Sequence, residues 1–430
     1  MKAILILYDF ILVLLIPFYL VSLILKGKFS FQVFKRFLIG DKAVWQVIKA
    51  KETIWLHAVS LGEVLTCKNL INKLSRKYPD KAILITTVTA TGMASAKSLS
   101  KDNIVSLYMP FDLGFLISHF IKTIKPNMLI LLETELWPNL LYYSQKKEVP
   151  VLVLNARLSD RSFGKYRLFS WFVKRLVKPV KMFCAQSDLD AGRFAQIGIE
   201  KERIKITGNM KFDTIDALDK VQSEEMLNLK DRISLASQDF LIVAGSTHDK
   251  EEEYILDIFK KLKVQFKNLR LLIAPRHLER IDSIEKMIAR KGLKPYRCSS
   301  FNSPSSDGVL ILDAVGKLLL IYGLADLVFV GGSLVPVGGH NILEPAFFGK
   351  PIIVGPYTHN FREITEAFLS AGALAQAEDV KDMESKIAEL ISNRDRLIEL
   401  GRAAKSVLSS RQGATPANLA IIEKTLNRDL

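Results

Sequence analysis

The sequence is poor in cysteine. Its 430 residues contain three, Cys67, Cys184 and Cys298, which lie far apart in the chain. No CxxC pair and no cysteine–histidine pairing occurs, which argues against a disulfide framework and against a zinc site. No HExxH-like pattern is present either. The sequence therefore predicts no metal centre.

Two glycine-rich nucleotide signatures are also missing. Neither GxGxxG nor GxxxxGK[ST] occurs, which disfavours a dinucleotide-dependent oxidoreductase and a P-loop NTPase. The net charge is +15, but no recognised nucleic-acid-binding module accompanies it. We therefore expect no nucleic acid partner and look for an anionic partner of another kind.

The longest apolar run stands at the amino terminus. Ala3 to Leu25 is interrupted only by Asp9, Pro17 and Ser22, and it is long enough to cross a bilayer core of about 30 Å. Seven of the residues from Lys26 to Lys51 are basic, whereas a cleaved signal peptide would end in small residues. The positive-inside rule then predicts a single membrane anchor with everything after it in the cytoplasm. A tilted or half-inserted helix remains open.

A second basic segment runs from Arg157 to Lys181. In "KYRLFSWFVKRLVK" its charges alternate with aromatic and aliphatic residues at helical spacing, a pattern typical of a basic helix at a membrane face. The alternative is a helix buried on one side with a solvated basic rim. The apolar amino terminus favours contact with an anionic membrane surface. The residues proposed for this acceptor and membrane face are Arg157, Arg161, Lys165 and Trp171.

Short apolar runs alternate with helical patterns twice along the chain. This alternation predicts an α/β protein with two doubly wound parallel sheets, and ligands should bind beyond the carboxyl ends of the strands, in a cleft between the domains. The expected organisation is an anchor at 1–28, an amino-terminal domain at 29–210, a connection at 211–239 and a carboxyl-terminal domain at 240–430. The expected strands are "TIWLHAV", "AILITTV", "IVSLYMP", "MLILLETE" and "PVLVLNA" in the first domain, and "FLIVAGS", "LRLLIAP", "GVLILDA", "LVFVGGS" and "PIIVGP" in the second.

Carboxylates follow two strands of the first half. Glu63 comes where the strand Thr53 to Val59 gives way to a helix, and Glu133 and Glu135 follow a later strand. A helix start favours a carboxylate electrostatically, so Glu63 is read either as a first-turn acid or as a base that accepts a proton from an attacking hydroxyl. Spacing alone favours the first reading slightly. The convergence of several polar groups on one sheet edge favours the second.

The second half contains a predicted anion site. Glycines permit close approach of the backbone, and free N–H groups at a helix start bind phosphate or carboxylate. Arg276 follows another strand of the same half, and the hydroxyl groups of Ser246 and Thr247 follow a third. The predicted site residues are Ser246, Thr247, Arg276, His277, Gly338, Gly339, Asn341 and Glu344.

Several of these motifs together resemble one enzyme family. "HAVSLGE", "ETELWPNLL", "TGNMKFD", "GSTHDKEEE", "APRHLER" and "GGSLVPVGGHNILEPAFFGKPIIVGPYTHNF" are similar to motifs of the 3-deoxy-D-manno-octulosonic acid (Kdo) transferases, which attach Kdo to lipid A. The resemblance spans roughly Phe29 to Ala420. It implies two Rossmann-like domains in the GT-B arrangement, with lipid A precursor bound by the first and CMP-Kdo by the second.

The resemblance also implies roles for individual residues. Glu63 would be the general base and Glu133 a second catalytic acid, while Arg276 would bind phosphate. Lys211, in "TGNMKFD", would help to hold the anionic donor, and Asn341 and Glu344 would belong to the nucleotide site. CMP-Kdo would be a substrate, with no cofactor or metal required. The alternatives are a UDP-sugar-dependent transferase or an epimerase of the same fold.

Overall fold

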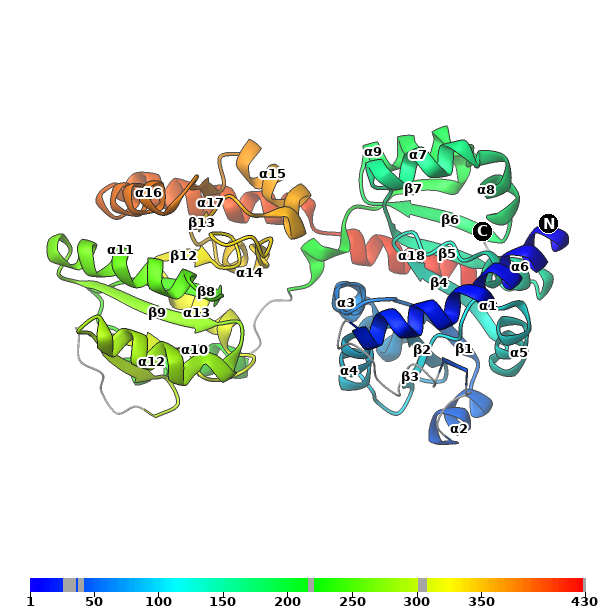
Figure 1. Cartoon of the computed structure of the whole chain (residues 1–430), viewed down its shortest axis with the longest axis horizontal. Helices are drawn as coiled ribbons and strands as arrows, with labels where there is room; N and C mark the ends of the chain where they lie inside the picture. Colours follow the sequence, from blue (N-terminus) through cyan, green and yellow to red (C-terminus); the bar gives the residue numbers. More distant parts are fainter. Residues whose placement is uncertain (26–35, 38–41, 216–219, 301–307, 428–430) are drawn as a thin grey trace. The chain divides into compact units, whose positions relative to one another are not determined.

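The computed structural model describes residues 1–25, 36–37, 42–215, 220–300 and 308–427 (Figure 1). The lysines of the predicted basic segment at positions 26, 28 and 35, and the predicted boundary at 28/29, lie outside these residues. The described chain forms two compact units, Met1–Thr214 with Arg411–Leu430, and Ile215–Ser410. Each unit has its own parallel sheet with helices on both faces, as the alternation of apolar runs predicts.

The sheet of the first unit has seven strands in the order β3-β2-β1-β4-β5-β6-β7. All neighbouring strands pair in parallel, and most strand residues are buried because helices cover both faces. The strands are β1 (Thr53–His57), β2 (Ala82–Thr87), β3 (Ile104–Tyr108), β4 (Pro126–Leu132), β5 (Val151–Ala156), β6 (Val180–Ala185) and β7 (Ile204–Ile206).

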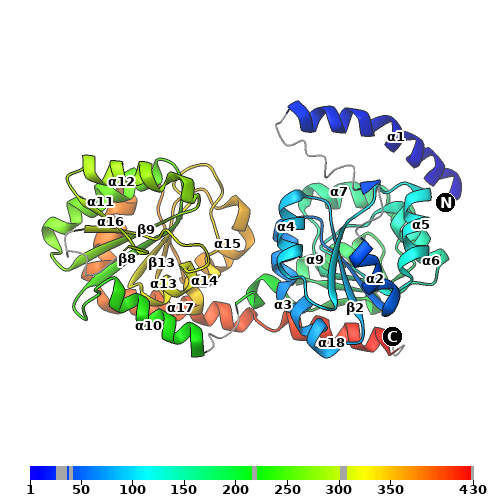
Figure 2. The ribbon, with the colours of Figure 1, turned by 90° about the horizontal axis from the view of Figure 1, so that it is seen from below.

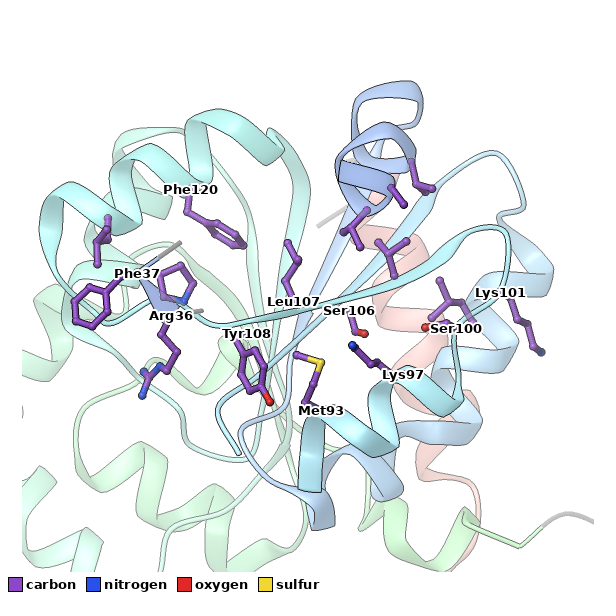
Figure 3. Close-up of a pocket in the computed structure, with 17 residues that line it drawn as sticks. Arg36, Phe37, Met93, Lys97, Ser100, Lys101, Ser106, Leu107, Tyr108 and Phe120 are labelled. Atoms are coloured by element: carbon purple, nitrogen blue, oxygen red, sulfur yellow. The ribbon is translucent and has the colours of Figure 1, made fainter. Parts of the chain in front are cut away.

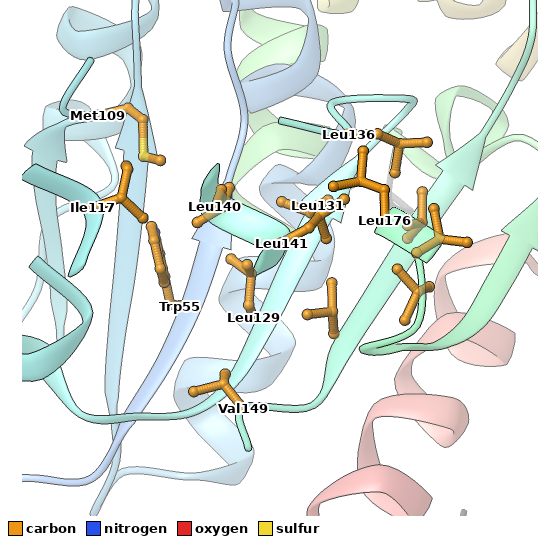
Figure 4. Packing of buried hydrophobic residues seen from close by; sticks show 14 of the residues in the cluster. Trp55, Met109, Ile117, Leu129, Leu131, Leu136, Leu140, Leu141, Val149 and Leu176 are labelled. Carbon is orange, nitrogen blue, oxygen red and sulfur yellow. The ribbon is translucent and has the colours of Figure 1, made fainter. Parts of the chain in front are cut away.

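Two hydrophobic clusters hold the helices of the first unit against this sheet. On one face, Trp55 of β1 and Leu129 and Leu131 of β4 pack against helices that include α5 and α6 (Figure 4). On the other face, α3 and α4 cover the sheet together with α18. The helices are α2 (Lys42–Ala50), α3 (Leu61–Lys77), α4 (Ala90–Ser98), α5 (Gly114–Ile124), α6 (Pro138–Lys146), α7 (Asp160–Leu168), α8 (Ser170–Leu176), α9 (Asp188–Gln196) and α18 (Ala414–Leu426).

The second unit repeats this architecture with the strand order β10-β11-β9-β8-β12-β13-β14, again all parallel. Its strands are β8 (Phe240–Thr247), β9 (Leu269–Pro275), β10 (Lys294–Arg297), β11 (Gly308–Ile311), β12 (Leu327–Val330), β13 (Ile352–Val354) and β14 (Ala375–Gln376). Its helices are α10 (Lys220–Arg232), α11 (Glu251–Gln265), α12 (Ile281–Arg290), α13 (Leu318–Leu324), α14 (Leu343–Phe347), α15 (Arg362–Ser370), α16 (Val380–Ser392) and α17 (Arg394–Arg411), the last of which ends at the unit boundary.

The end of the chain differs from the expected organisation. We expected 240–430 to form one domain, but α18 belongs to the first unit. Ile421 and Ile422 are buried in its hydrophobic cluster, and Asp213 accepts hydrogen bonds from the backbone N–H groups of Gly413 and Thr415. The expected connection at 211–239 also contains structure, because α10 packs against α13 within the second unit.

The amino-terminal run forms helix α1 (Lys2–Leu25), which contacts α5 (Figures 1 and 2). Asp9 accepts hydrogen bonds from Gly114 N–H at 3.2 Å and from Asn139 Nδ2 at 2.7 Å, so the acid that interrupts the run ties it to α5 and α6. No helix among the described residues has the length and apolar character needed to cross a membrane. The predicted anchor is therefore not confirmed.

Candidate functional site

Glu63 lies in the first turn of α3, where two polar groups hold its side chain. Ser60, the residue that caps α3, donates its hydroxyl to Oε1 at 2.7 Å and accepts from Glu63 N–H at 3.3 Å. Val59 N–H donates to Oε2 at 2.8 Å. This pattern is a variant of the capping box, in which Glu63 accepts from the N–H group of Val59 and not from that of the N-cap residue Ser60. The first-turn reading is therefore correct in geometry, but it does not account for the electrostatics of the carboxyl group.

Glu63 is 9% exposed, taken over the whole residue. Burial raises its pKa to about 7, with further small contributions from Glu135 and Glu133, although the two hydrogen bonds oppose the rise. A carboxyl group with this pKa is partly ionised at neutral pH and can accept a proton there. The same residue can therefore cap the helix and act as a base.

The neighbouring strand ends add strained backbone to this edge. Glu133 follows β4 and Asn155 lies at the end of β5, and both have left-handed φ angles, 55° and 54°. Such values are uncommon outside glycine and often mark functional positions. Asn155 is buried, and its Oδ1 accepts from Met210 N–H at 2.9 Å. Its Nδ2 has no partner among the described residues, a donor that a ligand could satisfy.

His57 belongs to the same edge, and the sequence reasoning missed it. Its ring is fully buried, and burial lowers its pKa to about 3, so it is neutral at pH 7. It packs edge-on against Trp137, whose Nε1 donates to Glu135 at 2.7 Å. The Nε2 atom of His57 finds no partner among the described residues. The signal was a histidine at the end of the strand that precedes Glu63.

The basic segment differs from the single helix that we expected. The chain breaks at Phe169 into α7 and α8. Trp171 is 53% exposed, and the neighbouring Leu168 and Phe169 are also exposed. Arg161 and Lys165 lie exposed on α7, while Arg157 is half-buried before it. Lys211 lies in the first unit, in a short 3-10 helix (Met210–Asp213) where its N–H donates to Asn209 Oδ1 at 2.9 Å.

In the second unit, a buried carboxylate organises the glycine-rich loop. Glu251, at the start of α11, accepts hydrogen bonds from the N–H groups of Gly332 at 2.7 Å, Ser333 at 3.0 Å, Leu334 at 2.9 Å and His248 at 2.9 Å. These amides therefore already hold an internal anion. Sequence reasoning did not single out Glu251.

The second glycine pair also differs from expectation. The N–H groups of Gly338 and Gly339 both donate to the carbonyl oxygen of Gly332, at 3.0 and 2.7 Å. Gly338 has a φ of 110°, and a Cβ atom there would meet Asn360 Nδ2 at 2.6 Å. These glycines permit a tight turn and close packing, and their amides are engaged within the loop.

A cationic and aromatic cluster lies on the same unit. His248 Nε2 is 2.7 Å from His340 Nε2. The ring of His277 packs edge-on against the ring of His248, with the ring centroids 5.6 Å apart. Burial, followed by the charges of its neighbours, lowers the pKa of His340 to about 4. Arg276 is exposed and acts electrostatically on His248, His340 and Glu344. The fold therefore gathers Arg276, His277 and Glu344 around one region.

The remaining predicted residues of the second unit have internal partners. Asn341 donates to Glu344 at 3.1 Å and accepts, at 3.1 Å, from the N–H group of Leu343, the first residue of the five-residue helix α14. Burial raises the pKa of Glu344. Thr247 donates its hydroxyl to Glu252 at 3.0 Å, so this hydroxyl is engaged. Ser246 adopts a left-handed φ of 56° at the end of β8.

Comparisons with known proteins give consistent matches. The family model of 3-deoxy-D-manno-octulosonic-acid transferases matches residues 32–214, and that of group 1 glycosyl transferases matches residues 230–407. The chain is 35% identical to the 3-deoxy-D-manno-octulosonic acid transferase of Haemophilus influenzae, over 88% of each chain. It is 30% identical to the corresponding transferase of Chlamydophila psittaci, over 74% of this chain and 73% of that one.

A solved structure shows the same fold. The UDP-GlcNAc 2-epimerase from Neisseria meningitidis, bound to UDP-GlcNAc, aligns with 87% of this chain and 100% of its own, with a TM-score of 0.57 and 12% identity. At this identity the likeness concerns the fold alone. It agrees with the two-sheet architecture predicted from the sequence.

Proposed function

Since the chain belongs to the 3-deoxy-D-manno-octulosonic acid (Kdo) transferase family, we propose that this glycosyltransferase of lipopolysaccharide biosynthesis moves Kdo from CMP-Kdo to the lipid A precursor lipid IVA. The acceptor hydroxyl attacks the anomeric carbon of Kdo, and the bond from that carbon to the CMP phosphate oxygen breaks. The hydroxyl proton passes to Glu63. Direct displacement of this kind inverts the anomeric carbon.

The environment of Glu63 carries this proposal. The carboxyl group is buried with a pKa of about 7, and its two hydrogen bonds fix its orientation. A general base works best when its pKa lies near the operating pH, because it is then both ionised and basic. Glu133 lies close enough for its charge to raise the pKa of Glu63. We assign Glu133 to the acceptor side as a second catalytic acid.

The donor is assigned to the second unit. CMP is a monophosphate leaving group, and the guanidinium of Arg276 can stabilise its departing charge through a charge-assisted hydrogen bond. His277, Ser246 and Glu344 would line the rest of this site. Lys211, a residue of the first unit, is proposed to help to hold the anionic donor.

The protein is further proposed to act at the inner membrane, with both units in the cytoplasm. Helix α1 exposes large apolar side chains, including Phe10 at 61% and Phe18 at 73%, and Trp171 adds an aromatic side chain beside basic residues of α7 and α8. Aromatic and basic side chains together suit an anionic membrane surface. Deleting Met1 to Leu25 should weaken flotation with anionic vesicles and leave a salt-sensitive remainder. If the truncated protein shows no vesicle binding even at low salt, the assignment of the basic segment to the membrane face is wrong.

Product analysis tests the main proposal. The full chain is incubated with lipid IVA and either CMP-Kdo or UDP-GlcNAc, and the lipid is analysed by mass spectrometry. We expect lipid IVA to gain the mass of Kdo with CMP-Kdo alone. A product formed from UDP-GlcNAc and none from CMP-Kdo would overturn the donor assignment, and Kdo transferred only to a different acceptor would overturn lipid IVA.

A further inference from the structure

A cavity of about 770 Å³ runs along the edge of the sheet in the first unit (Figure 3). Its floor is β3, the outermost strand, and its walls come from α2, α4 and α5. The volume lies within the range of roughly 300 to 1,000 Å³ that is typical of small-molecule sites. The residues that line it are Arg36, Phe37, Ala43, Val44, Val47, Met93, Lys97, Ser100, Lys101, Ile104, Val105, Ser106, Leu107, Tyr108, Pro110, Leu116 and Phe120.

The lining is apolar along its length and cationic at its ends. Met93 and Leu107 lie near the middle and Phe120 lies toward Arg36, whereas Lys101 lies at the other end and Lys97 lies between Met93 and Lys101 (Figure 3). No aspartate or glutamate is among the described residues that line it. Lys101 donates to the neutral amide oxygen of Asn72 at 3.3 Å, a contact that leaves its charge uncompensated.

At the opposite end, packing and a hydrogen bond hold the Arg36 side chain in place. The Arg36 side chain donates to the carbonyl oxygen of Met109 at 2.9 Å and lies over the ring of Phe111 at 4.0 Å. Its guanidinium is thus part of the packing. The two lysines remain as the cations that an incoming anion would meet.

We propose that this groove binds one acyl chain of an anionic membrane phospholipid, with the phosphate beside Lys97 and Lys101. A hydrocarbon chain matches the apolar middle, and an anionic headgroup matches the cationic end. The inference rests on the proposed location at a membrane, but it concerns a site that the transfer reaction does not use.

The direction of the sheet separates this site from the chemistry. Lys97 lies near the carboxyl end of α4 and Lys101 precedes β3, so both lie at the amino edge of the parallel sheet. Glu63 follows the carboxyl end of β1, at the opposite edge. A headgroup held by the two lysines is therefore not placed to react at Glu63, which favours a bilayer phospholipid over the acceptor as the occupant.

Neighbouring surfaces support a bilayer as the source. Helix α5 contributes Leu116 and Phe120 to the groove and exposes Phe115 by 68%. Helix α1 packs against the same helix, where Asp9 accepts a hydrogen bond from Gly114 N–H, and α1 exposes Phe10. Exposed apolar side chains thus adjoin the groove.

Binding of lysophosphatidylglycerols of increasing chain length to the full chain tests this proposal. Each methylene group buried in the groove should tighten binding about fourfold until the chain fills it, after which the affinity should level off. Lys97→Glu combined with Lys101→Glu should weaken binding about tenfold or more. Ser106→Trp, which fills the groove, should do the same without any change of charge.

Lys146→Glu with Lys147→Glu is the matched control, because these exposed lysines of α6 and its end carry the same charge change outside the groove. Melting temperatures identify variants that fail to fold. Affinity that is independent of chain length, or unaltered by both groove variants, would overturn the proposal. Competition by lipid IVA but not by phosphatidylglycerol would overturn the phospholipid assignment.

Kdo transfer to lipid IVA is measured in the same preparations. Groove variants that lose the lysolipid but keep transfer in detergent solution support an accessory site. If the parent protein transfers Kdo fully but shows no chain-length-dependent binding of the lysolipid, only the proposed lipid groove is overturned. Absence of transfer in the parent, with intact lysolipid binding, would count against the proposed function and leave the groove standing.

Discussion

Glu63 and Glu251 occupy matching places in the two units, since each lies at the start of the helix that follows the unit's first strand. Both are buried, and burial raises the pKa of both. Their hydrogen bonds differ. Glu251 accepts from four backbone N–H groups, whereas Glu63 accepts from one N–H group and one hydroxyl.

The number of donors separates a carboxylate whose acceptor positions are filled from one that could still bind a substrate hydroxyl. A carboxylate has about four acceptor positions. Those of Glu251 are filled, so protonation would break contacts that hold the glycine-rich loop. Glu63 keeps about two positions for a substrate hydroxyl. Burial and a raised pKa alone do not distinguish the two residues.

Replacing Glu63 should have the largest effect. Glu63→Gln keeps the size of the side chain and abolishes proton acceptance, so the rate of Kdo transfer should fall about 100-fold or more while CMP-Kdo binding stays nearly intact. Steady-state rates and melting temperature are measured together. Asp190→Asn is a matched control, because Asp190 forms the same serine–acid pattern with Ser187 at the start of α9. A glutamine variant that melts early and transfers Kdo at the parental rate would sink the base assignment and make Glu133 the leading alternative.

Replacing Glu251 should affect stability instead. Glu251→Gln turns amide hydrogens toward backbone N–H groups that need an acceptor, so the free energy of unfolding should fall by about 2 kcal/mol. Denaturant titration measures this loss, with Glu253→Gln as the exposed control on the same helix. Unchanged stability would show that the four hydrogen bonds contribute nothing measurable.

Arg276→Ala sharpens the contrast within the second unit, where Arg276 is exposed and Glu251 is saturated internally. A lost charge-assisted contact to the CMP phosphate should reduce kcat/KM for CMP-Kdo about tenfold, with kcat lowered as well because the contact strengthens as the phosphate departs. Initial rates over a range of donor concentrations measure both. Parental kinetics at every concentration would remove Arg276 from the site.

The smallest expected effect concerns pH. Protonated Glu63 cannot act as a base, so the transfer rate should fall as the pH drops below about 7. Ser60→Ala removes one hydrogen-bond donor to the carboxylate and so raises the pKa of Glu63. The acidic limb of the pH–rate profile should therefore move to higher pH, and the rate at neutral pH should fall about threefold. A pH–rate profile measures the shift, and Ser187→Ala is the control. An acidic limb that stays in place would contradict the assignment of that limb to Glu63.

The same pKa predicts the sign of a stability effect. The folded state holds the Glu63 proton more tightly than an unfolded chain, in which the pKa is near 4.5. Glu63 therefore favours the folded state below pH 4.5, and this contribution is lost as the pH rises through 7. Glu63→Gln should flatten that part of the stability profile.

Most strands of the sheet interiors were predictable because they are continuous apolar runs. Two parallel sheets followed from their alternation with helices. The short edge strands β7, β10 and β14 were missed, since "IKI", "KPYR" and "AQ" carry no such run. The interior strand β6 was missed as well, because Lys181 interrupts the apolar run of "VKMFCA". The pattern of α18 predicts a helix with a buried face, but it does not say which core covers that face.

Candidate site residues could be selected from the sequence where a polar side chain follows a strand end. Glu63, Glu133 and Arg276 were selected in this way, and their roles stay predictions. Glu251 was not, because "KEEE" resembles a solvated run of acids, and its partners Gly332 to Leu334 lie about 80 positions later in the chain. The phosphate-binding interpretation of Gly338 and Gly339 overlooked Gly332, whose carbonyl oxygen takes both of their N–H groups.

The return of α18 to the first unit has a consequence for biosynthesis. Domains of a growing chain usually fold in order from the amino terminus. Here the first unit cannot complete its core until Ile421 and Ile422 leave the ribosome, whereas the second unit ends at Ser410. The unit that begins first is therefore the last to be finished, and until then the face of its sheet that α18 covers stays open to the solvent or to a chaperone.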